Sequence, residues 1–123
     1  MFLKLKNLWI VTLAGLSSDR IHAIIRRWNK EDRWGLGKQW IDAADSIGAN
    51  VVEGCGRQHP KDALHFLYMA RGSLVETENW LKLARNRGLI SAIEASQLDT
   101  AYYRLSCGLN SLIAVRRKNL PTN

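Results

Sequence analysis

Cysteine is scarce in this sequence, with only two in 123 residues. Cys55 and Cys107 lie far apart, and neither has a neighbour at the short spacing that a metal site uses. A framework held by disulfides is therefore not expected. The pattern favours a reduced protein of the cytoplasm.

The signals of β-structure are also missing. No segment alternates convincingly between polar and apolar residues, and no hairpin turn sequence occurs. The chain has no internal repeat, low-complexity stretch or linker. Its length, with 46 % hydrophobic and 24 % charged residues, is typical of one globular domain, which we place at residues 1–123.

No constellation of catalytic or metal-binding residues is evident. Asp62 and His65 have the i, i+3 spacing of a ligand pair in di-iron bundles, but such a site needs a second copy and two further inward carboxylates. Gly54 and Gly56 follow no strand, so they do not indicate a phosphate-binding loop. We expect no catalytic residue, no metal, no cofactor and no enzymatic activity.

What the sequence does contain is helical periodicity in four long segments. The segments run from near Leu3 to Trp28, from Asp32 or Trp34 to Glu53, from Pro60 to about Arg87, and from Ser91 to near Arg116–Lys118. The inward stripe predicted for the first is Val11, Ala14, Ile21, Ile24, Ile25 and Trp28. Short connections between long amphipathic helices predict an all-α, up-and-down antiparallel four-helix bundle.

Local sequence chemistry marks the helix ends. Gly54 and Gly56 are expected to stop the second segment in the left-handed conformation, and Pro60 suits the first position of the third. Gly88 is expected to cap the third segment in the same left-handed way. Ser91 and Glu94 have the spacing of a capping box that opens the fourth. Residues 54–59, called the joint below, thus form the corner of a helical hairpin.

The N-terminus allows two interpretations. Two lysines precede an apolar run from Leu8 to Leu16, which resembles a signal peptide in outline. The alternative, which we favour, is that the run forms the first half of a bundle helix. The run is too short to span a bilayer, and no membrane partner is expected.

The chain is strongly basic, with a formal net charge of +7. This excess favours a polyanionic partner, nucleic acid first and an anionic membrane surface second. An antiparallel bundle would place Arg26, Arg27, Arg85 and Arg87 at one pole. It would gather Arg57, Lys61, Arg116, Arg117 and Lys118 at the other. We predict these residues as nucleic-acid contacts, because arginine donates paired hydrogen bonds to phosphate. The alternative is that cations gather at helix C-termini to complement the helix dipole.

Polar residues near the joint suggest a structural role. Asn50 and Glu53 fall on or near the expected packed side of their helix, where buried polar groups need partners. Ser73 or backbone amides of the next helix could supply them. We interpret Asn50, Glu53 and Ser73 as a polar clasp between the two helices.

Apolar side chains exceed what one core requires. Five tryptophans are many for so short a chain, and further apolar residues lie on second faces of the third and fourth segments. This surplus predicts a subunit interface and a homo-oligomer. The alternative is that the tryptophans close the ends of the bundle.

Two stretches carry a resemblance to a known family: QWIDAADSIGANVVEGCGR at residues 39–57 and HFLYMARGSLVETENWLKLARNRGLI at residues 65–90. The chain resembles the small bacterial four-helix-bundle proteins encoded by intervening sequences in large-subunit ribosomal RNA genes. More distantly, it is similar to the accessory variability proteins of diversity-generating retroelements. The family's signature is similar at Asn50, Glu53, Gly54, Gly56 and Arg57, but Ile41 and Asp42 stand where members usually carry basic residues.

The resemblance implies properties that the residues alone do not. It implies a ring-shaped homopentamer, association with RNA and, for the retroelement branch, with a reverse transcriptase; neither branch implies enzymatic activity. We therefore expect a non-enzymatic protein that binds nucleic acid, RNA rather than DNA, as an accessory to a reverse transcriptase or ribonucleoprotein. The alternative is a protein-interaction scaffold with no direct nucleic-acid role.

Overall fold

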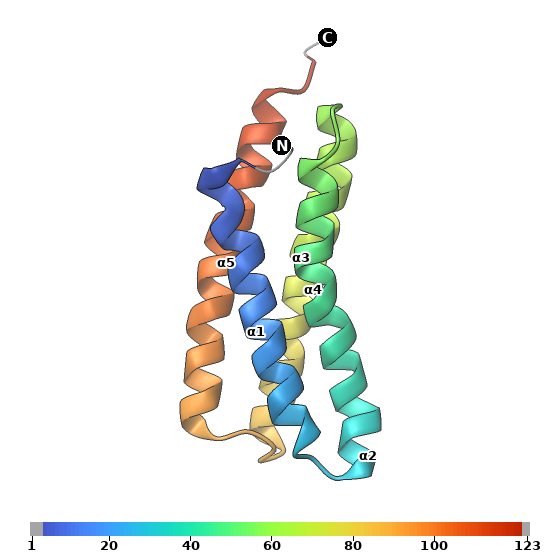
Figure 1. The fold of residues 1–123 in the computed structure, drawn as a ribbon, viewed down its shortest axis with the longest axis vertical. Coiled ribbons are helices and arrows are strands. Elements are labelled where there is room, and N and C mark those ends of the chain that lie inside the picture. The colour runs from blue at the N-terminus through green and yellow to red at the C-terminus, as the bar shows by residue number, and fades with distance from the viewer. Residues whose placement is uncertain (1–3, 122–123) are drawn as a thin grey trace.

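The computed structural model describes residues 4–121, and the part of the chain that it describes is helical without strands. The elements are the 3₁₀ turn η1 (Leu5–Asn7), α1 (Leu8–Arg26), α2 (Lys30–Asp32), the π-helical turn η2 (Arg33–Gly37), α3 (Lys38–Cys55), α4 (Pro60–Asn86) and α5 (Ala92–Lys118). The four long helices α1, α3, α4 and α5 run alternately up and down (Figure 1). The predicted all-α four-helix bundle is confirmed.

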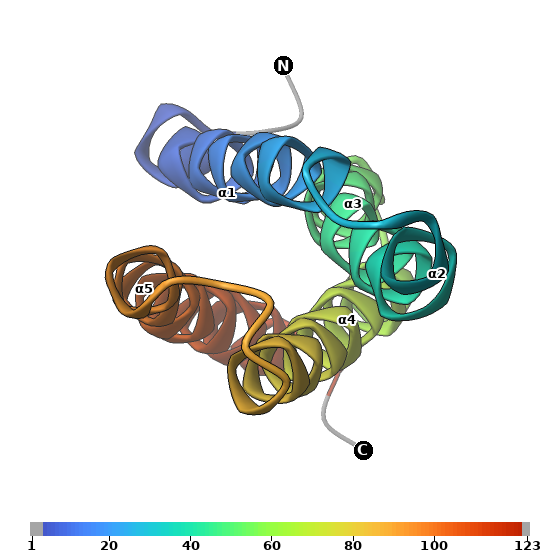
Figure 2. The same cartoon turned by 90° about the horizontal axis from the view of Figure 1, so that it is seen from below.

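Helices that follow one another in the chain are neighbours in space. Seen from below, α1, α3, α4 and α5 succeed one another around the bundle (Figure 2). This order follows from the short connections. Because a short loop cannot cross the bundle, each helix begins next to the end of the helix before it. The predicted second helix is more finely divided than expected, because α2 and η2 precede α3.

The predicted inward stripes form the core, with one shift in α1. Trp40, Leu67, Leu105 and Leu109 are fully buried. In α1 the buried position is Ile10, one residue before the predicted Val11, which is half-buried on the flank that faces α3.

By length and composition, α1 is long and apolar enough to cross a membrane. The sequence prediction considered only the apolar run from Leu8 to Leu16, which is shorter than this helix. Its inward face, with Ile10, Ile21 and Ile25, is instead packed in the bundle. The predicted start of this helix near Leu3 lies outside the described residues.

The caps around the α4–α5 turn form as predicted. Gly88 has a φ of 69°, and it is the one described residue with a left-handed backbone. Ser91 accepts a hydrogen bond from the backbone N–H of Glu94, whose carboxylate accepts one in return from the N–H of Ser91. Pro60 opens α4.

The second predicted segment does end at this point, since α3 stops at Cys55 and Gly56 is its C-cap, but the left-handed conformation predicted for Gly54 and Gly56 is wrong. Gly54 lies inside α3, and Gly56 has a right-handed φ of −82°. Gly54 serves close packing instead: a Cβ there would lie 3.1 Å from the carbonyl oxygen of Ala63 and 3.2 Å from Leu67. The absent side chain lets α3 approach α4 beside the joint.

Candidate nucleic-acid interface

One end of the bundle gathers four chain segments. The start of α1, the end of α3, the start of α4 and the end of α5 meet there, together with the joint (Figure 1). We call this end the joint pole. The opposite pole holds the end of α1, α2, η2 and the α4–α5 turn (Figure 1).

The joint pole is rich in cations and poor in carboxylates. The acidic residues in its terminal turns are Glu53 and Asp62. Its basic residues are Lys4, Lys6, Arg57, Lys61, Arg116, Arg117 and Lys118. The structure thus brings together the predicted residues of the joint and of the C-terminal helix.

Arg57 is the one cation of the joint pole that is held by an acidic partner among the described residues. Its guanidinium lies 2.5 Å from the carboxylate of Glu53, one helical turn away, and 4.7 Å from the ring centroid of Phe66. Both side chains of the ion pair are about half exposed, so the pair is weak.

An aromatic–arginine cluster continues the basic surface along α4 and α5. Arg117 Nε donates a hydrogen bond of 2.8 Å to the hydroxyl oxygen of Tyr68. The guanidinium carbons of Arg71 and Arg117 lie 5.2 and 5.4 Å from the Tyr68 ring centroid. Arg71 is held in turn by Asn110, an uncharged partner.

Neither arginine of this cluster is neutralised by a carboxylate among residues 4–121. The sequence interpretation counted Tyr68 among the surplus apolar residues of a second helix face and did not link it to arginine, although the spacing of Tyr68 and Arg71 at i, i+3 places them on one helix face. The cross-helix contact with Arg117 depends on the register of α4 against α5, which the sequence does not state.

The side chain of Arg116 does not join Arg117 at Tyr68. It is half-buried and lines a cavity with Lys4, Lys6 and Cys55. Burial raises the pKa of the Cys55 thiol, although the Arg116 guanidinium acts in the opposite direction. The thiol is therefore neutral near pH 7.

At the opposite pole the predicted basic residues are brought together, and two of the four are paired with carboxylates. Arg27 pairs with Glu94 at 2.6 Å, and Arg85 pairs with Asp99 at 2.5 Å. Burial alone would raise the pKa of Glu94, but hydrogen bonds from Arg27 and Ser91 outweigh it and hold that pKa below its usual value.

Arg26 and Arg87 are exposed at the opposite pole without an acidic partner among the described side chains. The two poles thus differ in charge balance. Acidic residues of α5 pair with two arginines at the opposite pole, Arg27 and Arg85, whereas Arg57 is the one paired cation of the joint pole among the described residues.

Of the predicted polar clasp, only Ser73 bonds across α3 and α4, and its partner is Ser46 rather than Asn50 or Glu53. Ser46 Oγ donates to Ser73 Oγ across α3 and α4 at 2.6 Å, and Asn50 donates to the backbone oxygen of Ser46 at 2.9 Å. Glu53 does not join them. Its side chain points to solvent and pairs with Arg57, because position 53 lies off the inward stripe of α3.

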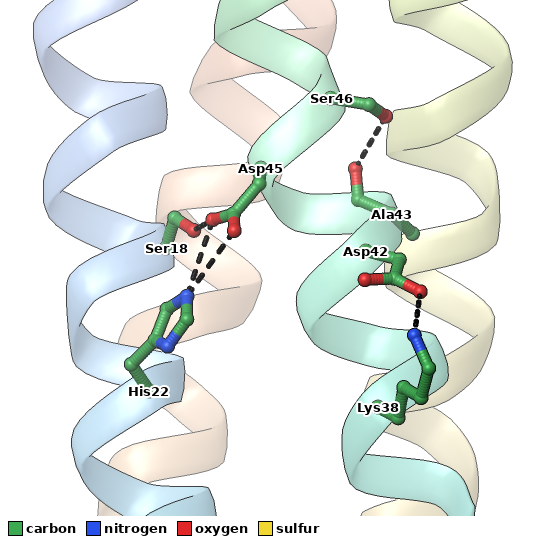
Figure 3. A network of polar contacts seen from close by, with 7 residues as sticks. All are labelled: Ser18, His22, Lys38, Asp42, Ala43, Asp45 and Ser46. Carbon is green, nitrogen blue, oxygen red and sulfur yellow. Dashed lines mark hydrogen bonds and ion pairs between the residues drawn. The ribbon is translucent and has the colours of Figure 1, made fainter.

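A serine, a histidine and an aspartate meet between α1 and α3, which the sequence interpretation missed (Figure 3). Ser18 Oγ donates to Asp45 Oδ1, and His22 Nε2 lies 3.3 Å from both carboxylate oxygens of Asp45. A nucleophilic serine needs its hydroxyl on the imidazole. Here the hydroxyl and the imidazole share one carboxylate, so the cluster joins two helices.

The described side chains offer no metal centre. Across residues 4–121, no group of three or more His, Cys, Asp or Glu side chains is placed to hold a metal ion. Asp62 and His65 lie on exposed positions of α4, and no third ligand accompanies them in this part of the chain.

Comparison with known proteins agrees with the fold. A family model described as "23S rRNA-intervening sequence protein" matches residues 6–111. The chain is similar to a crystal structure of a protein of unknown function from the S23 ribosomal protein family of Bacteroides thetaiotaomicron, with a TM-score of 0.77. The two are 24 % identical over 85 % of this chain and 97 % of that chain. No curated protein matches.

Proposed function

Since the chain belongs to the family of 23S rRNA-intervening sequence proteins, we propose that it is a non-enzymatic protein of the cytoplasm that binds RNA through the joint pole. The observation that carries the proposal is the charge distribution. The cations of the joint pole outnumber its carboxylates, and only Arg57 among them has an acidic partner within residues 4–121.

The phosphate backbone is the part of RNA that this surface suits. Arg117 and Lys118 are exposed in the last turn of α5, where each can pair with a phosphate. Arg71 and Arg117 flank Tyr68, so an unpaired base can stack beside guanidinium groups that hold the adjacent phosphates. Binding of this kind is salt-sensitive and has little sequence preference.

We further propose that copies of the chain assemble into a homopentameric ring. The support is the family resemblance and the exposed apolar residues of α1, where Leu8 and Trp9 are 38 % exposed and Leu16 is 62 % exposed. Such side chains on one helix are typical of a subunit interface. A ring would repeat the joint pole around its axis and add the fields of the copies.

The accessory role with a reverse transcriptase or another ribonucleoprotein enzyme belongs to the same proposal. A basic ring without chemistry of its own would hold template RNA while a partner acts on it.

The second candidate is a protein-interaction scaffold, which is favoured by the exposure of Trp34 at 66 % and Ile93 at 71 %. Aromatic and aliphatic side chains of this kind anchor protein partners.

Charge reversal at the two poles tests RNA binding. Filter binding with a structured RNA at low salt should give a large loss of affinity for the variant Arg117→Glu with Lys118→Glu. The matched control reverses Arg26 and Arg87, which are exposed at the opposite pole, and should bind nearly as the wild type does. The proposal fails if the wild type does not bind at low salt, or if both variants lose affinity equally.

Purification from the host with nuclease treatment separates the two candidate functions. RNA-mediated association should be lost on nuclease digestion and at high salt, because it depends on phosphate contacts. A protein partner that remains bound after both treatments would support the scaffold.

A further inference from the structure

The joint pole contains a cavity of about 250 Å³, and the phosphate contacts proposed above for Arg117 and Lys118 do not involve it. Its walls come from three segments that are distant in sequence: Lys4, Lys6 and Asn7 before and within η1, Cys55 at the end of α3, and Arg116 and Asn119 at the end of α5. The side chains of Leu112 and Val115 complete the wall on α5.

The lining has the composition of an anion site. Two lysines and one arginine are among the lining residues, together with Asn7, Asn119 and Ser111, whose amide and hydroxyl groups are able to donate hydrogen bonds. None of the described lining residues is acidic. Cations that line one small cavity repel one another, and a bound anion relieves that repulsion.

The size of the cavity limits the ligand. A volume of about 250 Å³ corresponds to about eight water molecules at ~30 Å³ each. That is enough for a phosphate group with its sugar, but it is below the usual range for drug-sized ligands. An internal phosphodiester continues as a chain on both sides and carries one charge. A terminal phosphate continues on one side and carries nearly two charges at neutral pH.

We propose that this cavity binds a terminal phosphate monoester, with Lys4, Lys6 and Arg116 as the anion-binding residues. The source of the phosphate is the end of an RNA chain, and this choice rests on the proposed RNA-binding function. A free mononucleotide presents the same chemistry, so the experiment separates the two sources.

Oligonucleotides of one sequence that differ only at their ends provide the first test. RNA with a terminal phosphate should bind at least about tenfold more tightly than RNA with hydroxyls at both ends, as expected for added charge-assisted hydrogen bonds. The preference should be lost in Lys6→Ala with Arg116→Ala. It should persist in the control Lys118→Ala, which removes a cation of the same pole outside the cavity.

A local measurement keeps the test independent of the variants' folding. In a Cys107→Ser background, Cys55 is the one remaining cysteine, and its alkylation rate reports on the cavity. Adenosine monophosphate should slow that alkylation at concentrations where adenosine does not, and a phosphorylated RNA end should do so at much lower concentrations than the mononucleotide.

The outcomes distinguish this inference from the proposed function. Equal affinity for both kinds of RNA end, or a preference that survives in the cavity variant, would overturn the inference while RNA binding stands. Protection of Cys55 by adenosine monophosphate in a protein that binds no RNA would support the cavity as a phosphate site. It would overturn the RNA end as the source.

Discussion

Replacement of Gly54 by alanine tests the packing of α3 against α4. The new Cβ would lie 3.1 Å from the carbonyl oxygen of Ala63 and 3.2 Å from Cγ and Cδ2 of Leu67. The carbonyl belongs to the backbone of α4 and cannot move aside alone, and Leu67 is fully buried. The two helices must therefore separate slightly beside the joint.

Two effects of opposite sign decide how much Gly54→Ala changes the free energy of unfolding. Alanine in place of glycine inside a helix stabilises by about 1 kcal/mol. Overpacking of a well-filled contact costs about 1–3 kcal/mol. The net expectation for Gly54→Ala is a loss of about 1 kcal/mol, which lowers the Tm by roughly 3–5 °C for a chain of this size.

Gly48→Ala is the matched control in the same helix. Its Cβ would meet the Cβ of Ala14 at 3.6 Å, an ordinary van der Waals contact. Here the helix propensity gain has little to oppose it, and the variant should be more stable by up to ~1 kcal/mol. Urea denaturation followed by circular dichroism measures both. If Gly54→Ala stabilises as much as Gly48→Ala, the close approach of α3 and α4 is refuted.

Three further substitutions follow from single features of the fold. Ser91→Ala removes the N-cap of α5 and should cost about 0.5–2 kcal/mol in urea denaturation, whereas a neutral result would contradict the capping box. Leu105→Ala empties a fully buried site and should cost about 2–5 kcal/mol in the same assay; a cost below 1 kcal/mol would contradict its burial. Glu94→Gln should lower the Tm at pH 7, because a carboxyl whose folded pKa lies below its usual 4.5 stabilises above that pH. The difference from the wild type should shrink as the pH falls through the lowered pKa, and a difference that is constant down to pH 3 would contradict the pairing with Arg27.

Local chemistry is what the sequence predicted well. The capping box of Ser91 and Glu94 and the left-handed Gly88 depend on residues a few positions apart, so the pattern contains all that decides them. The inward stripes were predictable for the same reason, because the 3.6-residue period of the helix sets which residues share a face. Gly54 was misassigned because its role depends on Ala63 and Leu67 across the joint, not on its own backbone.

The candidate site was predictable only as a set of charges at a pole. An up-and-down topology brings Arg57, which follows α3, and Arg117, at the end of α5, to the same end of the bundle regardless of detail. Which cations are neutralised depends on the register between helices, and that register pairs Arg27 with Glu94 and Arg85 with Asp99. The cavity beside Cys55 needs three segments to meet and has no signature in the sequence.

The salt dependence of RNA binding tests the central claim most directly. The logarithm of the association constant is measured against the logarithm of salt concentration for the wild type and for Arg117→Ala with Lys118→Ala, using a single-stranded RNA without terminal phosphates. Loss of two phosphate contacts should make the slope shallower by roughly 1.4, at about 0.7 per contact. A wild-type slope near zero, or an unchanged slope in the variant, would contradict RNA binding through the joint pole.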